Sequence, residues 1–459
     1  MSKAIVLFMN DKEIQKNEQL VQLVNNSSAD FSVQLVDNQV QVLVKEVQQR
    51  KKTKDKIRML AGEIARELRN RKVKNAEIHE ESLWNEFSPW SKDDVVTAFV
   101  EGWELGSYQF IKYKHNVEAF TTELSWEGTE FSSAIEAGKI RAKATMFARD
   151  LKNEIPSFLN PVTFPEILED TFKDTAVNVT VLRQPEIEER EMNGILTVCR
   201  GSKHDPAFVE LSYCGDETKP LVALVGKGVT FDTGGISLKD ARDLSNMRMD
   251  MGGAAAVSGA MKLLADSGAK VNVVALIPIV ENIPDNTSVL PGDVITYKNG
   301  LHVQVANTDY EGRLILADGI IRATELEAEY IFNISTLTGS IMMALGTEMA
   351  GAFGDEELTF AIKKIGEENG DFIWPMPLID TYKEHFSSNY ADFSNLPKSD
   401  MAGAIAGGLF LSNFIPEDHK WLHIDMAGVM ESTERGYYGN SATGFGVRLL
   451  ADFTEHVSE

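Results

Sequence analysis

Two apolar segments that each run into a cluster of charged residues constrain the fold of this chain most strongly. Leu221–Val225 reads as a buried strand, and the four glycines between Gly226 and Gly235 break it into a loop. His302–Ala306 reads as a second strand that ends in another charged segment. The charged residues are Lys227, Asp232 and Lys239 after the first strand, and Asp309, Glu311 and Arg313 after the second. Charges placed this densely beside glycines and apolar strands need partners.

The segments around these loops alternate between helical and strand-like patterns. The helical patterns are Gly252–Leu264 and Leu314–Leu326, and the strand-like ones are Val271–Val280, Tyr330–Ser335 and Trp421–Met430. Further strands are expected upstream at Val177–Leu182, Ile195–Cys199 and Phe208–Tyr213. This alternation predicts an α/β fold, in which ligands bind beyond the carboxyl ends of the strands. Lys227, Asp309 and Thr336 all follow strands and are expected at that edge.

Two domains are expected, because 459 residues exceed what one hydrophobic core usually supports. Residues 1–127 alternate short strands with helical patterns and predict a smaller N-terminal α/β domain. Residues 128–156 hold a long helical pattern closed by Pro156, which predicts a connecting helix. Residues 157–459 are expected to form a larger C-terminal domain, with a central mixed sheet flanked by helices, that carries both charged loops.

The formal net charge of -24, from 45 basic against 69 acidic residues, argues against a surface built for nucleic acid or anionic lipid. The basic run Arg50–Arg58 is followed on the same predicted helix by Glu63 and Glu67, which favours a solvated face with paired charges. The two cysteines, Cys199 and Cys214, predict reduced thiols in the cytosol. Neither a signal peptide nor a membrane span is expected.

Four carboxylates would meet at the predicted strand ends and must be compensated by basic residues or metal ions. They are Asp232, Asp250, Asp309 and Glu311. Carboxylate-rich sites without His or Cys favour oxygen-loving ions or a two-metal arrangement, and no His-Glu-x-x-His motif is present. Taken singly, each carboxylate reads more simply as a turn residue bonded to its own backbone. Composition and spacing therefore reach no further than an acidic, metal-dependent α/β enzyme.

Asn307–Asp318, with the sequence NTDYEGRLILAD, resembles the signature of the leucyl (cytosol) aminopeptidase family of dinuclear metallopeptidases. Four supporting stretches occur in the family's order, namely Val225–Lys239, Met247–Ala255, Thr336–Gly339 and His423–Met430. The resemblance implies that residues 157–459 form a catalytic metallopeptidase domain. It further implies a cytoplasmic homohexamer that acts on peptides and is not associated with a membrane.

The resemblance also implies two divalent metal ions per subunit, manganese or zinc, with magnesium or cobalt as alternatives. The implied ligands are Lys227, Asp232, Asp250, Asp309 and Glu311, with Asp232 and Glu311 bridging the ions. A lysine ligand needs a neutral amine and hence a strongly lowered pKa. In the implied reaction, the ions bind the substrate's α-amine and scissile carbonyl and activate a water.

Two further residues take catalytic roles by the same resemblance. Lys239 would stabilise the oxyanion that develops on the carbonyl, and Arg313 would hold a bicarbonate that accepts the proton of the attacking water. The implied substrate-binding residues are Met247, Asn307, Thr336, Leu337, Gly339, Ala427 and Met430. Because the side-chain pocket among them is apolar or small, the resemblance implies release of Leu- or Met-like N-terminal residues in preference to Asp or Glu.

The chain departs from the family pattern at Tyr310, which stands between two implied metal ligands where the family usually has Ala. The N-terminal region matches poorly except around Glu101–Phe110, so a separate role of that region stays open. Two alternatives use the same fold: a DNA-binding regulator, which the net charge disfavours, and a catalytically inactive scaffold, which the complete set of site residues disfavours.

Overall fold

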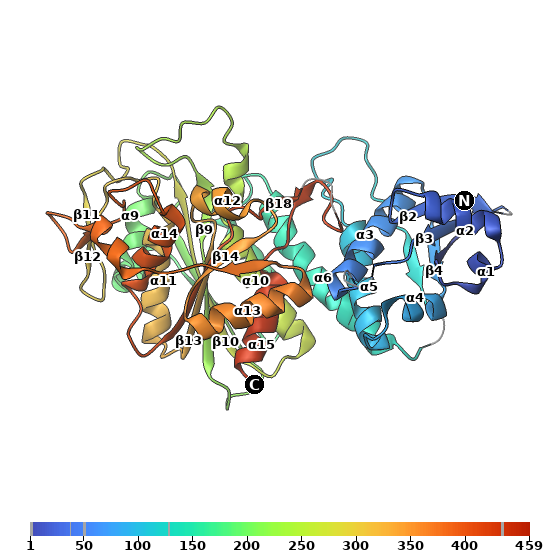
Figure 1. Ribbon diagram of the computed structural model, residues 1–459. Helices are drawn as coiled ribbons and strands as arrows, with labels where there is room; N and C mark the ends of the chain where they lie inside the picture. The colour runs from blue at the N-terminus through green and yellow to red at the C-terminus, as the bar shows by residue number, and fades with distance from the viewer. Residues whose placement is uncertain (1–2, 37, 49–51, 127–128, 433–435) are drawn as a thin grey trace. The chain divides into compact units, whose positions relative to one another are not determined.

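The computed structural model describes residues 3–36, 38–48, 52–126, 129–432 and 436–459. The chain divides into two compact units, Met1–Met146 with Ser432–Ser441, and Phe147–Glu431 with Ala442–Glu459. They are called here the N-terminal unit and the C-terminal unit (Figure 1). Each combines a β-sheet with helices, so the predicted two-part α/β architecture is confirmed. Helix α6 (Ser132–Asn153) lies within the segment predicted as a connecting helix.

The N-terminal unit is built on a five-stranded sheet with strand order β2-β3-β1-β4-β5. The strands are β1 (Lys3–Phe8), β2 (Phe31–Val36), β3 (Gln39–Val44), β4 (Asn75–Ile78) and β5 (Glu123–Ser125). The helices are α1 (Lys12–Gln15), α2 (Glu18–Asn26), α3 (Lys54–Asn70), α4 (Glu80–Phe87) and α5 (Lys92–Ser107). The β2–β3 pair is antiparallel and the other pairs are parallel. Apolar residues of β1, β3, α3 and α5 form the core.

The basic run of the N-terminal unit is paired with carboxylates on other elements. Lys52 contacts Glu86 at 3.2 Å and Lys54 contacts Asp94 at 2.8 Å. The buried Arg58 pairs with Glu101 at 2.8 Å. Arg50 and Lys51 lie outside the described residues. The described part of the run therefore serves local charge pairing, with partners on neighbouring elements. Its lysines are half-buried and Arg58 is buried, so the expected solvated face is not found.

The C-terminal unit is built on a nine-stranded mixed sheet with the order β15-β14-β17-β13-β8-β10-β7-β6, in which β9 pairs with the end of β10. The strands are β6 (Asn178–Leu182), β7 (Ala207–Cys214), β8 (Leu221–Gly226), β9 (Gly228–Asp232), β10 (Asn272–Asn282), β13 (Tyr330–Ser335), β14 (Ala350–Gly354), β15 (Ile373–Pro375) and β17 (Lys420–Asp425). The four central strands, β17, β13, β8 and β10, run parallel, so their carboxyl ends share one edge. Smaller sheets join β11 (Val294–Thr296), β12 (His302–Gln304) and β16 (Phe393–Ser394), and β18 (Glu431–Ser432) with β19 (Ser441–Ala442).

Helices cover both faces of this sheet (Figure 1). They are α7 (Thr163–Phe172), α8 (Gln184–Glu189), α9 (Asn193–Cys199), α10 (Gly252–Ser267), α11 (Gly312–Glu325), α12 (Gly339–Leu345), α13 (Glu356–Asn369), α14 (Gly403–Ser412) and α15 (Val447–Val457). A Cβ on Gly226 would meet Gly253 and Val257 of α10, whereas the neighbouring Val225 meets Gly319 of α11. Because successive strand residues point to opposite faces, α10 and α11 lie on opposite sides of β8.

Two expectations about local structure are wrong. Ile195–Cys199 is not a strand but belongs to helix α9. Its buried residues Ile195, Val198 and Cys199 have helical spacing, and the Ile195 N–H donates to Asp318 at 2.8 Å. The segment after Lys227 is not wholly a loop, because Gly228–Asp232 forms β9 along the end of β10. Short apolar runs do not distinguish helix from strand, and tertiary pairing decides between them.

The two cysteines, Cys199 and Cys214, are free. Among the described residues, no helix has the length and apolar character needed to span a membrane.

Candidate active site

The charged residues of the two loops meet in one cavity of about 250 Å³ in the C-terminal unit. It lies at the edge where the parallel strands end, since Lys227 follows β8 and Thr336 follows β13. Lining residues predicted from the sequence are Lys227, Asp232, Lys239, Met247, Asp250, Asp309, Glu311, Arg313, Thr336, Leu337, Gly339, Ala427 and Met430. Tyr310, Gly312, Thr338 and Met342 also line it. Asn307 is the predicted site residue that is not part of this lining.

Lys227 is buried beneath the cavity and held by three oxygens. Its Nζ lies 2.7 Å from Asp250 Oδ2 and 2.8 Å from Glu311 Oε1, and it donates to the Thr336 carbonyl at 3.2 Å. The side chain passes directly against Gly312, where a Cβ would lie 2.7 Å from Nζ. The glycine of the signature thus makes room for the lysine.

Lys239 closes the other side of the carboxylate cluster. Its Nζ lies 2.7 Å from Asp232 Oδ2 and also contacts Asp309 Oδ1. The loop that carries it turns through Gly234 and Gly235, whose φ angles of 90° and 67° favour glycine. A Cβ on Gly235 would also lie 2.7 Å from Asn282 Oδ1, so the close approach of the two loops requires glycine there.

The carboxylates and lysines perturb one another strongly. Burial raises the pKa of Asp250 to about 8 and that of Asp309 to about 6, and the neighbouring carboxylates add to both shifts. Burial opposes ionisation of Glu311, but Lys227 and Lys239 outweigh it and lower its pKa. Burial likewise opposes the charge on Lys227, yet Asp250, Glu311 and Asp232 outweigh it and raise its pKa. This is the reverse of the lowering expected for a lysine ligand, and adjacent cations would oppose the rise.

The donor set suits hard or borderline divalent cations. Asp232, Asp309 and Glu311 each offer a carboxylate oxygen, and these atoms lie within 4.8 Å of one another. Asp250 adds a fourth carboxyl group, and the two ammonium groups can balance no more than two negative charges once all four carboxyl groups are ionised. The ammonium nitrogens of Lys227 and Lys239 lie in direct contact with carboxylate oxygens. A cation is therefore electrostatically favoured at these positions.

A second layer of residues orders the rim of the cavity. Asp425, at the end of β17, accepts hydrogen bonds from Leu337 N at 3.1 Å and from Thr338 Oγ1 at 2.6 Å. Thr336 Oγ1 donates to Asp250 Oδ1 at 2.6 Å. The loop after β13 is therefore fixed both to the neighbouring strand and to a carboxylate of the cluster.

Arg313 is almost completely buried, and burial lowers its pKa to about 10. Its Nη1 donates to the Asn395 carbonyl at 3.0 Å, while Nε has no hydrogen-bond partner among the described residues. The rings of Tyr310 and Phe410 lie 4.7 Å and 5.4 Å from the guanidinium carbon, within the range of cation–π attraction. Tyr310, the departure noted in the sequence, thus contacts the implied anion-binding residue.

Asn307 and Asn395 make hydrogen bonds to the backbone of the signature loop. Asn307 Oδ1 accepts the Asp309 N–H at 2.8 Å. Asn395 is fully buried, and its Nδ2 donates to the Asn307 carbonyl at 2.7 Å while its Oδ1 accepts the Ala306 N–H at 2.8 Å. Neither Asn395 nor Asn282 is among the residues predicted from the sequence. Asn282 follows the predicted strand Val271–Val280, and that placement was the available signal, whereas Asn395 follows the two-residue strand β16, where no strand was predicted.

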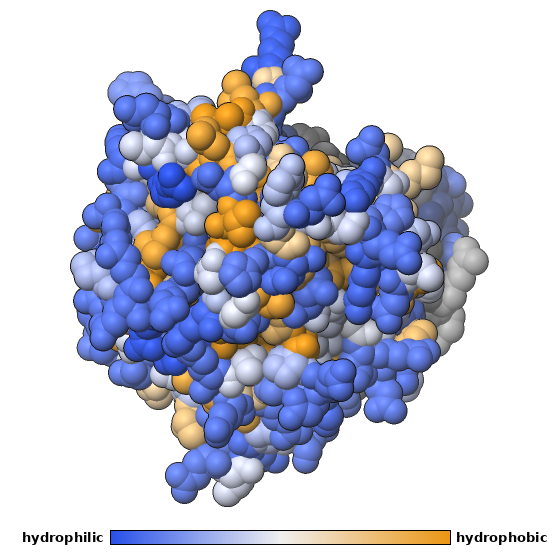
Figure 2. Space-filling model, turned by 90° about the vertical axis from the view of Figure 1, so that its left-hand side faces the viewer, coloured by the Kyte–Doolittle hydropathy of each residue, from blue (hydrophilic) through white to orange (hydrophobic). Residues whose placement is uncertain are grey.

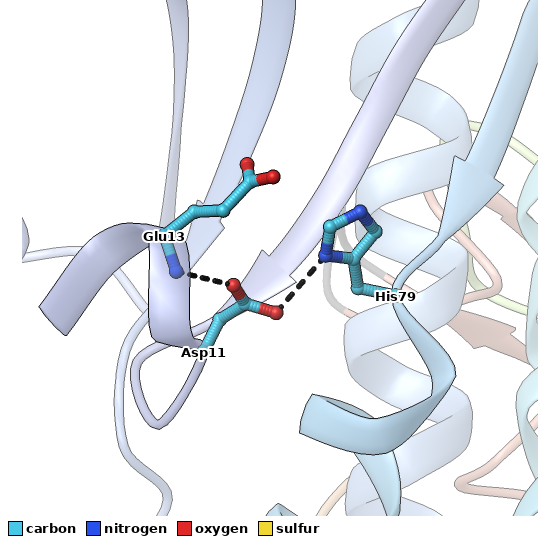
Figure 3. A group of neighbouring side chains, drawn as sticks. All are labelled: Asp11, Glu13 and His79. Carbon is cyan, nitrogen blue, oxygen red and sulfur yellow. Dashed lines mark hydrogen bonds and ion pairs between the residues drawn. The ribbon is translucent and has the colours of Figure 1, made fainter. Parts of the chain in front are cut away.

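A second group of potential ligands, Asp11, Glu13 and His79, lies in the N-terminal unit (Figure 3). These residues line a cavity of about 360 Å³. Asp11 accepts the Glu13 N–H at 2.9 Å as the N-cap of α1, and its other oxygen lies 3.1 Å from His79 Nδ1. Glu13 is exposed. Helix capping and the His79 contact account for Asp11, so this group does not compete with the buried cluster as the active site.

Family comparisons agree with the location of the buried cluster. The family model described as the cytosol aminopeptidase family, catalytic domain, matches residues 146–451, and the model for the N-terminal domain of that family matches residues 48–116. The chain belongs to the cytosol aminopeptidase family. It is 35% identical over 420 residues to the probable cytosol aminopeptidase of Persephonella marina, covering 90% of this chain and 84% of the relative. The corresponding protein of Nocardia farcinica is 38% identical over 374 residues, covering 79% and 74%.

A solved structure is similar to this chain over the full length of both. The bottromycin maturation enzyme BotP superposes with a TM-score of 0.89 at 26% identity, covering 100% of both chains. A second structure of that enzyme is a complex with Mn, with the same TM-score. This member of the cytosol aminopeptidase family is therefore a peptidase, with its charged cavity inside the region matched by the catalytic-domain model.

Proposed function

We propose that this protein is a metal-dependent aminopeptidase that holds two divalent ions with Lys227, Asp232, Asp250, Asp309 and Glu311. The observation that carries the proposal is the convergence of four carboxylates and two lysines in one cavity of the catalytic domain. Their close-set oxygens fit divalent cations, which would also favour the ionised form of Asp250. Manganese and zinc are the first candidates, and magnesium and cobalt would suit the same oxygen donors.

The ions, when bound, would supply Lewis acidity and a water nucleophile at neutral pH. Residues of the chain would stabilise the developing negative charge and hold the proton acceptor. Lys239 lies at the cavity wall with 22% of its side chain exposed, where a cation would stabilise negative charge that develops on a scissile carbonyl oxygen. Arg313 lines the cavity, and its guanidinium would suit it to hold a bicarbonate or another small anion that accepts a proton.

The proposed substrate is a peptide with a free N-terminus and an apolar first residue. Met247, Met430 and Ala427 line the cavity together with Thr336, Leu337 and Gly339, and Met342 adds a further apolar side chain. An unpaired carboxylate in such a pocket would lose its hydration without gaining a partner. We therefore propose a preference for Leu- or Met-like residues over Asp or Glu, with Asn307 contributing through its support of the Asp309 backbone.

The proposed working form is a cytoplasmic homohexamer. The name of the relatives supports the compartment. The catalytic domain exposes large apolar side chains that a subunit contact would cover, such as Met343 at 89%, Met401 at 82% and Tyr390 at 77% exposure. Figure 2 shows apolar surface distributed between hydrophilic residues over the face nearest β11, β12 and α14. Sedimentation velocity of the purified protein would give the oligomer size.

Hydrolysis of leucine p-nitroanilide tests the activity. The protein is stripped of metal with a chelator, and Mn²⁺ or Zn²⁺ is then restored. Release should require metal and should be absent with N-acetyl-leucine p-nitroanilide, because the proposal gives the free α-amine to the metal site. Asp309→Asn and Glu311→Gln should each abolish release, whereas Glu329→Gln, at an exposed carboxylate, should not. Full activity without metal, or equal rates on the acetylated substrate, would refute the proposal.

A further inference from the structure

We infer that Asn282 is a positioning residue, whose side-chain amide fixes the proposed metal ligand Asp232 and ties it to the signature loop. This inference rests on the proposed metal site and extends it to a residue outside the cavity lining. Asn282 ends β10 and is 2% exposed. Its Nδ2 donates to Asp232 Oδ1 at 2.9 Å and to the Thr308 carbonyl at 3.0 Å. One amide group thus contacts both charged loops.

The orientation of this amide follows from its partners. A carboxylate oxygen and a backbone carbonyl both accept hydrogen bonds, so only the NH₂ end of the side chain can face them. Both hydrogens of Nδ2 are used, one for each loop. The amide therefore sets the distance between Asp232 and the segment that carries Asp309 and Glu311.

One carboxylate oxygen of Asp232, Oδ1, accepts two hydrogen bonds. Oδ1 accepts from Asn282 and also from the Gly234 N–H at 2.9 Å. Oδ2 lies 2.7 Å from Lys239 Nζ, on the cavity side. Two donors on Oδ1 leave Oδ2 as the oxygen directed to the proposed ions, and they hold that orientation before any ion arrives.

The backbone around Asn282 is shaped for this contact. In the β9–β10 pair, Val280 lies opposite Val229 but Asn282 lies opposite Asp232, so β9 gains one residue through a bulge. Bulges redirect the side chains that follow them. The Asn282 carbonyl also accepts from Thr233 N at 3.0 Å and Thr233 Oγ1 at 2.8 Å, which fixes the asparagine against the start of the loop.

The two loops also have a connection that does not involve the amide. Thr308 Oγ1 accepts the Ser237 N–H at 2.9 Å, and Thr308 N donates to Ser237 Oγ at 3.2 Å. Loss of the amide should therefore leave the loops joined while removing one of the two donors that orient Asp232 Oδ1. This separates a role in ligand orientation from a role in folding.

The test is Mn²⁺ binding to the full-length protein, followed by the electron paramagnetic resonance signal of free Mn²⁺. Asn282→Ala should raise the dissociation constant of at least one ion by about 10–100-fold, the usual effect of removing a residue that orients a metal ligand. Asn282→Ser, whose hydroxyl can donate to only one acceptor, should fall between Asn282→Ala and the unaltered protein. Asn282→Ser also provides the test of Mn²⁺ binding if Asn282→Ala does not fold.

Thr233→Val is the matched control, because it removes the hydrogen bond that Thr233 Oγ1 donates to the Asn282 carbonyl and the one that it accepts from the Gly235 N–H, while leaving the amide contacts in place. It should bind Mn²⁺ as the unaltered protein does, even if its melting temperature falls. Unaltered affinity in both Asn282 variants, or equal weakening in Thr233→Val, would overturn the inference. Unaltered protein that bound neither Mn²⁺ nor Zn²⁺ would instead refute the metallopeptidase proposal on which it rests.

Discussion

Lys227 is the residue whose chemistry most restricts the proposed site. It lies between Asp250 and Glu311 with almost no exposure, so its charge state depends on what else the cluster holds. Lys227→Arg would keep the positive charge but supply no lone pair for a metal ion, and the wider guanidinium would press against Gly312. We expect aminopeptidase activity at saturating metal to fall by at least about 100-fold, the scale of losing one electrostatic contact at a reacting centre.

The measurement is the rate of leucine p-nitroanilide hydrolysis, with the circular dichroism spectrum as a check on folding. Lys262→Arg, at a partly exposed lysine paired with Asp266 on α10, is the control and should keep full activity. A Lys227→Arg enzyme with near-normal rate would remove Lys227 from the set of metal ligands.

Helix α11 shows how an element can oppose its own local preference. It begins at Gly312 and contains Gly319, although alanine is more favourable than glycine inside a helix by about 1 kcal/mol. A Cβ at position 312 would meet Lys227 Cε at 2.6 Å, whereas a Cβ at 319 would meet Val225 Cγ1 at 2.5 Å. The first glycine makes room for the site and the second for the core.

Gly312→Ala should therefore displace Lys227 and weaken Mn²⁺ binding and activity, with a small effect on the melting temperature. Gly319→Ala should lower the melting temperature, because its new methyl group overpacks the core, and should leave Mn²⁺ affinity unchanged. Calorimetric titration with Mn²⁺ and thermal unfolding distinguish the two. Equal loss of metal affinity in both variants would show that α11 acts only through general stability.

At the scale of the whole molecule, the net charge of -24 bears on the DNA-binding alternative. The described basic side chains of the run in the N-terminal unit are paired with carboxylates, so they offer little net attraction for phosphates. In a mobility-shift assay at about 50 mM salt, where such contacts are strongest, we expect no retardation of duplex DNA at micromolar protein. Retardation that weakened steeply with added salt would restore that alternative.

Much of the fold and of the candidate site could be predicted from the sequence. The pattern of apolar strands that end in charged, glycine-rich loops depends on local periodicity, and it placed Lys227 and Thr336 at the carboxyl ends of neighbouring strands. Asp309 lines the same cavity, but the strand before it, β12, belongs to a separate small sheet. The signature around Glu311 led to the family, which the family models confirm. Local pattern could not decide Ile195–Cys199, which is too short and too apolar to separate helix from strand.

The sequence by itself determined which residue types are available for chemistry: four carboxylates, two lysines and an arginine near glycines, in a chain with a large acidic excess. Only the tertiary structure decided which of them touch. The pairing of Lys227 with Asp250, the bulge that turns Asp232 toward Asn282, and the contact of Tyr310 with Arg313 join side chains from different elements. Such contacts depend on how strands register and how helices pack, because burial and close packing are properties of the whole fold.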